Sequence, residues 1–279
     1  MASRGGPHPL LKFLIHVACY AAALSMLTPF LWMISASLKT NEEVFAWPPR
    51  IIPHVPVFKN YVVAWQQAHI GRYFFNSVVV SAVITVLSLF FNALAGYAFA
   101  KLRFPGRDKI FFGMLATMML PMQVSVIFAY IIIVKLGYAG TYQSLIVPGL
   151  AGAFGIFYMR QSIAGIPNDL IDAGRVDGLS DFEIFLHLVL PLIKPALAAL
   201  AIFTFVGSWN SFFWPLIVVD TPELKTLPLA VADLSSGQVI QSWPMLMAAA
   251  TMLVMPMIVV FLIFQRQFIR GIAMTGLKD

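Results

Sequence analysis

Charged side chains are scarce in this 279-residue chain: Asp, Glu, Lys and Arg make up 11% of it, whereas hydrophobic residues make up 60%. An average soluble domain has about 25% charged residues. A single soluble core of this size cannot hide so much apolar surface from water. The scarcity of charge excludes a soluble enzyme and a disordered regulator, and it predicts a polytopic membrane protein.

Other features that would indicate chemistry are also missing. The single cysteine, Cys19, allows neither an internal disulfide nor a thiolate metal cluster. The sequence has no Gly-rich loop of the kind that cradles nucleotide phosphates, and no metalloprotease or serine-hydrolase motif. Its net charge of +6 is not concentrated in a basic cluster interleaved with a nucleic-acid-binding motif. We therefore expect no catalytic residue, no metal and no cofactor in this chain, and no nucleic-acid partner.

Six long runs contain no Asp, Glu, Lys or Arg, and each is long enough for the roughly 20 residues with which a helix crosses a bilayer. The first five cover residues 13–38, 73–100, 110–134, 136–159 and 195–219. The sixth covers 234–265, and we expect its helix over 243–265 because residues 235–238 are typical of a loop. Irregular backbone cannot face lipid, so the sequence predicts an all-α fold with six transmembrane helices in a single domain over 1–279.

The distribution of basic residues predicts the orientation of these helices. With the N-terminus in the cytoplasm, the inner segments 1–12, 101–109, 160–194 and 266–279 hold 12 of the 18 Lys and Arg residues. Cytoplasmic loops carry such an excess because basic residues resist translocation. We therefore expect both chain ends in the cytoplasm. The basic tail with Arg266, Arg270 and Lys278 is expected to contact anionic lipids.

The inner segment 160–194, called here the coupling loop, is acidic, with five Asp or Glu residues against three Lys or Arg. Asn168 or Asp169 can cap a helix after Pro167, and Asp172 and Arg175 have the spacing of an ion pair on that helix. Gly178 suits the left-handed residue that ends a helix. These signals predict a helix, then a sharp turn.

A second helix follows the turn. Ser180 and Glu183 have the spacing of a capping box, and Pro191 limits the helix. Ala173 and Gly174 leave a bare surface on the first helix, which a partner's groove can approach closely. Residues 182–190 are apolar enough to pack in the membrane domain. The alternative is a plain amphipathic connector that rests on lipid headgroups.

The coupling loop resembles the motif E-A-A-x3-G-x9-I-x-L-P of the permease subunits of bacterial ATP-binding-cassette (ABC) importers. Here it reads Asp172-Ala173-Gly174, then Gly178, then 188–191, with the same spacing. Asp172 replaces Glu, Gly174 replaces the second Ala, and Leu188 replaces Ile. Residues 120–123, 136–137, 209–216 and 265–271 are similar to stretches of the maltose-type carbohydrate permeases. The resemblance covers nearly the whole chain.

The resemblance implies that this chain is one of several different subunits of a transport complex in a bacterial inner membrane. This chain would form the path for a sugar together with a second, homologous permease. A dimeric ABC ATPase would bind ATP and Mg, and an extracytoplasmic solute-binding protein would deliver the substrate. The residues implied in coupling to the ATPase are Asp172, Ala173, Gly174, Arg175, Asp177, Gly178, Leu188 and Pro191.

Candidates for the translocation path combine polar and aromatic side chains. Asn210 lies near the outer end of the fifth run beside Trp209 and Phe213, and aromatic faces can stack on sugars. Gln123 and Asn92 are further intramembrane polar residues, which usually face the protein interior or a water path. Each could instead bond a neighbouring helix. Ala93 and Gly96 predict a packing face of small residues.

The main alternative is an ion-coupled secondary transporter. Such proteins usually place ionisable residues inside the membrane. None of the six runs contains Asp, Glu, Lys or Arg. This argues against proton coupling and less strongly against sodium coupling. A purely structural subunit would not need the acidic coupling loop.

Overall fold

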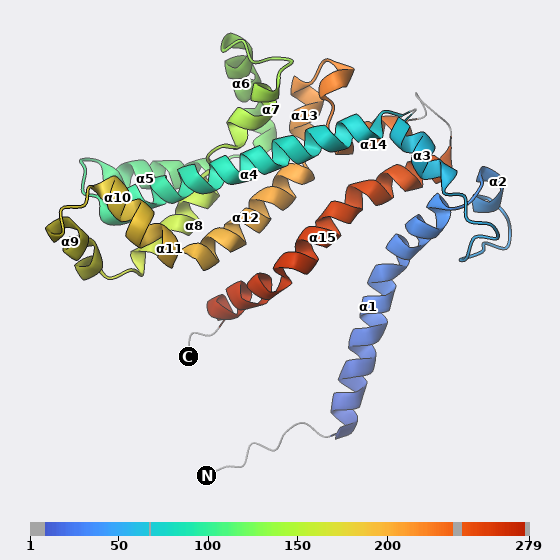
Figure 1. Cartoon of the computed structure of the whole chain (residues 1–279), viewed down its shortest axis with the longest axis horizontal. Helices are drawn as coiled ribbons and strands as arrows, with labels where there is room; N and C mark the ends of the chain where they lie inside the picture. The colour runs from blue at the N-terminus through green and yellow to red at the C-terminus, as the bar shows by residue number, and fades with distance from the viewer. Residues whose placement is uncertain (1–8, 67, 237–241, 277–279) are drawn as a thin grey trace. The chain divides into compact units, whose positions relative to one another are not determined.

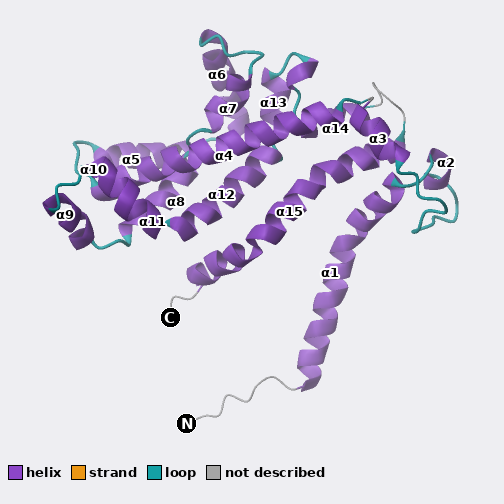
Figure 2. Cartoon of the chain, in the orientation of Figure 1, coloured by secondary structure: helices purple, strands orange, loops and turns teal. Residues whose placement is uncertain are grey.

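The computed structural model describes residues 9–66, 68–236 and 242–276, and every regular element in these ranges is a helix (Figure 2). The chain divides into two compact units. The first holds residues 1–70 and 233–254, and the second holds 71–232 and 255–279. The expectation of an all-α fold is confirmed.

The first unit contains α1 (Pro9–Ser37), α2 (Asn41–Val44), α3 (Lys59–Gln66) and residues 243–254 of α15 (Trp243–Gly276). The segment between α1 and α3 is held by hydrogen bonds. The Asn60 amide donates to the carbonyls of Ser37 at 2.8 Å and Lys39 at 2.9 Å. Lys39 is fully buried, with its ammonium 4.5 Å from the Trp32 ring centre and bonded to the Arg50 carbonyl. This segment is therefore ordered.

The second unit is built along α4 (Ile70–Lys101) (Figure 1). The elements that follow are α5 (Arg107–Thr117), α6 (Met122–Lys135), α7 (Tyr142–Ile146), the 3₁₀ turn η1 (Val147–Gly149), α8 (Ala153–Ala164) and α9 (Asn168–Val176). Then come α10 (Asp181–Ile184), the π-turn η2 (Phe185–Val189), α11 (Leu190–Leu192), α12 (Lys194–Trp209), α13 (Phe213–Val218), the 3₁₀ turn η3 (Pro222–Leu224) and α14 (Leu227–Ser235). Figure 1 shows α5, α9 and α10 beside the C-terminal end of α4.

Within the described ranges, four helical segments are long and apolar enough to cross a membrane: Leu10–Ser37, Ile70–Lys101, Tyr142–Ala164 and Trp243–Gln265. A fifth forms if Asp181–Leu192 and Lys194–Trp209, which meet at an 83° bend, count as one broken span. The start of α15 at Trp243 confirms the predicted helix start. Residues 237–241 of the loop expected before it lie outside the described part of the chain.

The sequence predicts one helix over 110–134 that Pro121 kinks or breaks, and the break is observed. The structure has two shorter helices there, α5 and α6, and the chain between them turns at 118–121. Pro121 precedes α6 with an extended backbone (φ −60°, ψ 136°), which a proline adopts readily and a helix interior excludes. The fourth and fifth runs are likewise interrupted. The fourth holds α7, η1 and the start of α8 in place of one helix, and in the fifth α12 ends at Trp209 and α13 begins at Phe213.

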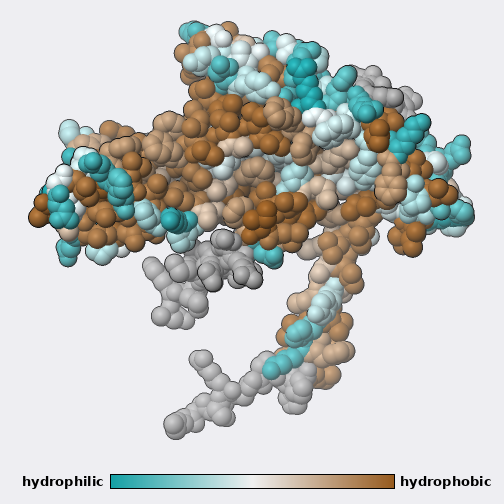
Figure 3. Space-filling view, viewed as in Figure 1, coloured by the Kyte–Doolittle hydropathy of each residue, from teal (hydrophilic) through white to brown (hydrophobic). Residues whose placement is uncertain are grey.

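The core of the second unit joins α4, α8 and the coupling loop. Tyr97, Met159 and Ile163 are buried together with Ile184 and Phe185. Figure 3 shows apolar residues over the middle of this unit and hydrophilic ones around α9 and α10. The second half of the coupling loop therefore belongs to the core of the membrane unit.

Small residues allow α4 and α8 to approach closely. A Cβ at Gly96 would lie 2.7 Å from the Cβ of Met159 and 2.8 Å from the Arg160 nitrogen. Ala93 is fully buried in the same core. The predicted packing face of Ala93 and Gly96 is confirmed.

Candidate coupling site

The first helix of the coupling loop, α9, starts differently from the prediction. Pro167 occupies the N-cap position and no side chain caps the helix, so the prediction of a cap by Asn168 or Asp169 is wrong. Asn168 instead accepts a hydrogen bond from the Lys101 ammonium at 2.8 Å. The same ammonium donates to the Ile166 carbonyl at 2.5 Å. The last residue of α4 therefore holds the start of α9, a role that the sequence alone did not indicate.

The predicted ion pair on α9 is present. The Arg175 guanidinium lies 3.2 Å from Asp172 and 3.1 Å from Asp181, so it joins α9 to the start of α10. Its hydrogen bond to Asp181, and the charges of both carboxylates, raise the pKa of Arg175 above the usual value. Exposed pairs of this kind add little stability, but two carboxylates on one guanidinium fix its orientation.

The predicted turn between the two helices is confirmed. Gly178 has a φ of +85°, the left-handed conformation that favours glycine. The Leu179 nitrogen donates to the Gly174 carbonyl at 3.0 Å, which closes the end of α9. Ser180 then caps α10 in a complete capping box with Glu183, in which the Ser180 nitrogen lies 2.8 Å from the Glu183 carboxylate. Local sequence signals therefore determine this turn.

Gly174 does not belong to the surface offered to a partner, and that prediction is wrong. The residue is buried, and a Cβ there would lie 2.9 Å from Leu188 Cδ1 and 3.1 Å from Ile184 Cγ1. Glycine thus lets α9 pack directly on the second half of the coupling loop. Ala173 is exposed, as predicted.

The second half of the loop is anchored in the core. Ile184, Phe185 and Val189 are fully buried, which confirms that residues 182–190 pack in the membrane unit. The backbone widens to a π-turn before Pro191, a residue that has no N–H to donate to the preceding turn. The helix ends at Leu192, one residue beyond Pro191.

The exposed side of α9 is the candidate surface for a partner and is called here the docking face, defined as Leu170, Ala173, Val176 and Asp177. All four are exposed, and Val176 is 88% exposed at the end of the helix. Residues at such spacing lie on one side of a helix. Leu170 and Val176 were not among the predicted residues, although the apolar spacing 170, 173, 176 was visible in the sequence.

The predicted path residues fall into two places. Asn210 caps the end of α12 at its break from α13, with its amide 3.9 Å from Met257 Sδ. Phe213 is 41% exposed at the start of α13. Trp209 is buried between Phe205 and Phe74, with ring centres 5.8 and 5.7 Å away, so in this conformation it offers no face to a ligand. Gln123 is exposed on a separate helix, α6.

Asn92 bonds within its own helix, α4, and to the residue that precedes α8. Its amide donates to Ser88 at 2.7 Å and its oxygen accepts from the Gly152 nitrogen at 3.1 Å. The residue is 2% exposed. Both ends of this amide are therefore occupied within the chain. The side chains of the predicted basic tail lie outside the described part of the structure.

Long apolar helices with an amphipathic helix–turn–helix loop anchored in their core are typical of a multi-pass membrane transport subunit. The model of the family described as "Binding-protein-dependent transport system inner membrane component" matches residues 92–274. The chain belongs to this family. It is a multi-pass inner membrane permease subunit of a bacterial binding-protein-dependent ABC importer, and it is not an enzyme.

Curated relatives match almost the full length of the chain. The arabinooligosaccharides transport system permease protein AraQ of Halalkalibacterium halodurans is 33% identical over 97% of this chain and 98% of its own. The lactose transport system permease protein LacG of Rhizobium radiobacter is 31% identical over 90% of each chain. The sn-glycerol-3-phosphate transport system permease protein UgpE of Pectobacterium atrosepticum is 33% identical over 92% of this chain and 94% of its own.

The fold is also that of a solved transporter. A chain of a bacterial ABC transporter involved in the import of the acidic polysaccharide alginate superposes with a TM-score of 0.83. The match covers 95% of this chain and 99% of that one at 22% identity. At this identity the likeness shows the fold alone. Membership of the permease family excludes the ion-coupled secondary transporter considered above.

Proposed function

We propose that this permease subunit imports an oligosaccharide or a related polyol, in a complex with a second, homologous permease. The relatives named for arabinooligosaccharides and lactose support a sugar, and the one named for sn-glycerol-3-phosphate supports a small polyol derivative. A solute-binding protein delivers the substrate. A dimeric ABC ATPase binds ATP and Mg, and this chain holds no cofactor.

The proposed topology is a single membrane domain of six spans with both chain ends in the cytoplasm. Four long apolar helices and one bent pair support five of these spans. The sixth is the broken pair α5 and α6, whose short apolar segments follow one another within the charge-free run 110–134. The excess of Lys and Arg in the inner segments supports the orientation.

The observation that carries the proposal is the contrast between the two halves of the coupling loop. The docking face on α9 is exposed, whereas Ile184, Phe185 and Val189 are fully buried. An amphipathic helix with apolar residues at such spacing suits a hydrophobic groove on a partner. The ATPase therefore docks on α9, and the packing of Gly174 against Leu188 transmits its movement to the spans.

The residues proposed for coupling act in different ways. Ala173 and Asp177 contact the ATPase, and the Asp172–Arg175 pair orients α9. Gly174 and Leu188 join the two halves of the loop, and Gly178 and Pro191 set its turn and its end. In the translocation path, Asn210, Phe213 and Gln123 contact the sugar, with Trp209 packed behind Asn210.

Cross-linking tests the docking face most simply. Val176→Cys, in a chain where Cys19→Ala removes the native thiol, should form a cross-link to the ATPase in membranes treated with a maleimide that carries a benzophenone, because the photoactivated benzophenone inserts into C–H bonds and needs no thiol on the partner. Val55→Cys is the matched control, because Val55 is 66% exposed and lies in the segment expected outside. An adduct from Val55 alone, or from neither position, would contradict docking on α9. Mass spectrometry of the purified complex would identify its partners.

A further inference from the structure

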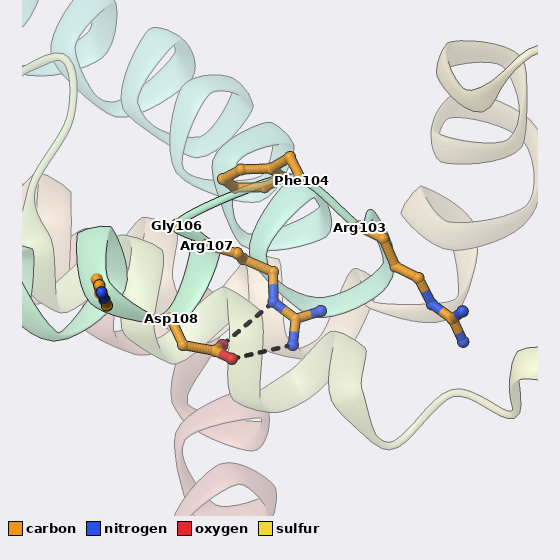
Figure 4. A pocket seen from close by; sticks show the side chains of 6 residues that line it. Arg103, Phe104, Gly106, Arg107 and Asp108 are labelled. Carbon is orange, nitrogen blue, oxygen red and sulfur yellow. Dashed lines mark hydrogen bonds and ion pairs between the residues drawn. The ribbon is translucent and has the colours of Figure 1, made fainter.

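We propose that a basic pocket beside α9 binds a phosphate oxyanion. The pocket has a volume of about 750 Å³ and lies between residues 100–107 and α9, bounded also by Asp181. Its ionic lining consists of Lys101, Arg103, Arg107, Arg175, Asp172 and Asp181. Cavities of about 300–1,000 Å³ are typical of small-molecule sites. A neighbouring pocket of about 520 Å³ shares Arg103 and Arg107 (Figure 4).

The charges in this lining do not cancel. Arg175 is paired with Asp172 at 3.2 Å and with Asp181 at 3.1 Å, so both carboxylates of the pocket are engaged. Arg107 is paired with Asp108 at 3.2 Å and also donates to the Leu102 carbonyl. The positive charges of Lys101 and Arg103 therefore remain to be balanced.

Lys101 and Arg103 have different surroundings. Among the described residues, the Lys101 ammonium donates to two neutral oxygens, those of Ile166 and Asn168, and no carboxylate balances its charge. Within the described part of the chain no hydrogen bond or ion pair engages Arg103, and its side chain is exposed. In Figure 4 its guanidinium points away from the Arg107–Asp108 pair. Arg103 is thus free to bind an incoming anion.

The chemistry of the lining suits phosphate. A guanidinium presents a planar pair of N–H donors that matches phosphate oxygens, and an ammonium adds a compact positive charge. Basic pockets near the cytoplasmic ends of membrane helices bind phospholipid headgroups. Ala100, Leu102 and Phe104 also line the pocket and provide an apolar wall for the glycerol part of such a headgroup.

Phosphate in this pocket would bridge α4 and α9. Lys101 ends α4 and holds the start of α9, while Arg103 follows in the same segment. Binding would therefore stiffen the helix to which the ATPase docks. This consequence rests on the proposed coupling function, whereas binding of the oxyanion does not.

The test uses the transporter complex purified in uncharged detergent and stripped of lipid. Native mass spectrometry would count bound phosphatidylglycerol against phosphatidylcholine, and calorimetry would follow inorganic phosphate. Arg103→Ala should weaken binding about tenfold or more, because charge-assisted hydrogen bonds contribute about 1.5–3 kcal/mol. Lys194→Ala is the matched control, since this exposed lysine carries the same charge and lines neither pocket.

The two binding measurements distinguish a phospholipid headgroup from a soluble phosphate anion. Selective binding of phosphatidylglycerol that inorganic phosphate does not displace would identify a lipid headgroup. Binding of inorganic phosphate itself would identify a soluble anion. Equal binding by Arg103→Ala and the unmodified chain, equal loss in Lys194→Ala, or a cross-link from Arg103→Cys to an acidic segment of the ATPase would overturn the proposal. These readouts need no transport, so they stay informative if α9 proves not to couple.

Discussion

Gly174 shows how one residue sets the spacing between the two halves of the coupling loop. The family motif that the loop resembles has Ala at this position and Ile at 188, whereas this chain has Gly and Leu. The two differences meet in space, because a Cβ at Gly174 would lie 2.9 Å from Leu188 Cδ1. We infer that the longer reach of Leu188 fills the space that an alanine methyl would occupy.

A double-mutant cycle tests this compensation. Gly174→Ala alone should lower the melting temperature of the complex, because overpacking costs about 1–3 kcal/mol while the gain in helix propensity offsets only about 1 kcal/mol. Adding Leu188→Ile should restore stability, with a coupling energy of about 0.5–3 kcal/mol between the two changes. Strictly additive effects would show that the two residues do not compensate for each other.

At the scale of elements, Lys101 connects α4 to α9 through two hydrogen bonds from one ammonium. Lys101→Met keeps the length of the side chain and removes both donors. The amides at the start of α9 should then exchange with deuterium several-fold faster, because the helix has no side-chain cap to replace the lost contact.

Hydrogen-exchange mass spectrometry of the complex would measure this effect, with Lys194→Met as the control for a loss of charge. Lys101→Arg should retain part of the protection, since a guanidinium can donate to the same acceptors. Unchanged exchange in Lys101→Met would mean that packing under α9 alone holds the helix.

The elements also show which features a sequence predicts well. The turn at Gly178, the Ser180–Glu183 capping box and the Asp172–Arg175 pair follow from neighbours in the chain, and all three are present. Pro121 indicated the break between α5 and α6, whereas the role of Lys101 was not predicted. The hydropathy of a charge-free run indicates that the run lies in the membrane. It does not show whether one continuous helix spans it. The contacts of Lys101 join residues 65 and 67 positions apart, beyond the reach of a local signal.

At the scale of the whole molecule, topology follows from the placement of charge. Single-cysteine chains without Cys19 test it with a membrane-impermeant maleimide. Trp47→Cys, at a position 89% exposed, should react in intact cells, whereas Val176→Cys should react only after the inner membrane is opened. Labelling of both sites from the same side would contradict the proposed orientation.

The central claim is that the coupling loop links ATP hydrolysis to import. Its most direct test measures both activities together in proteoliposomes that contain the complex, the binding protein and its sugar. Gly178→Val forces a β-branched residue to a φ of +85°, and because an added Cβ would meet no atom within 4 Å, the change strains the backbone of the turn. The account predicts an assembled complex in which uptake and stimulation by the binding protein are lost, whereas Gly178→Asn, which tolerates this conformation better, retains part of both. Full uptake by Gly178→Val would contradict the claim.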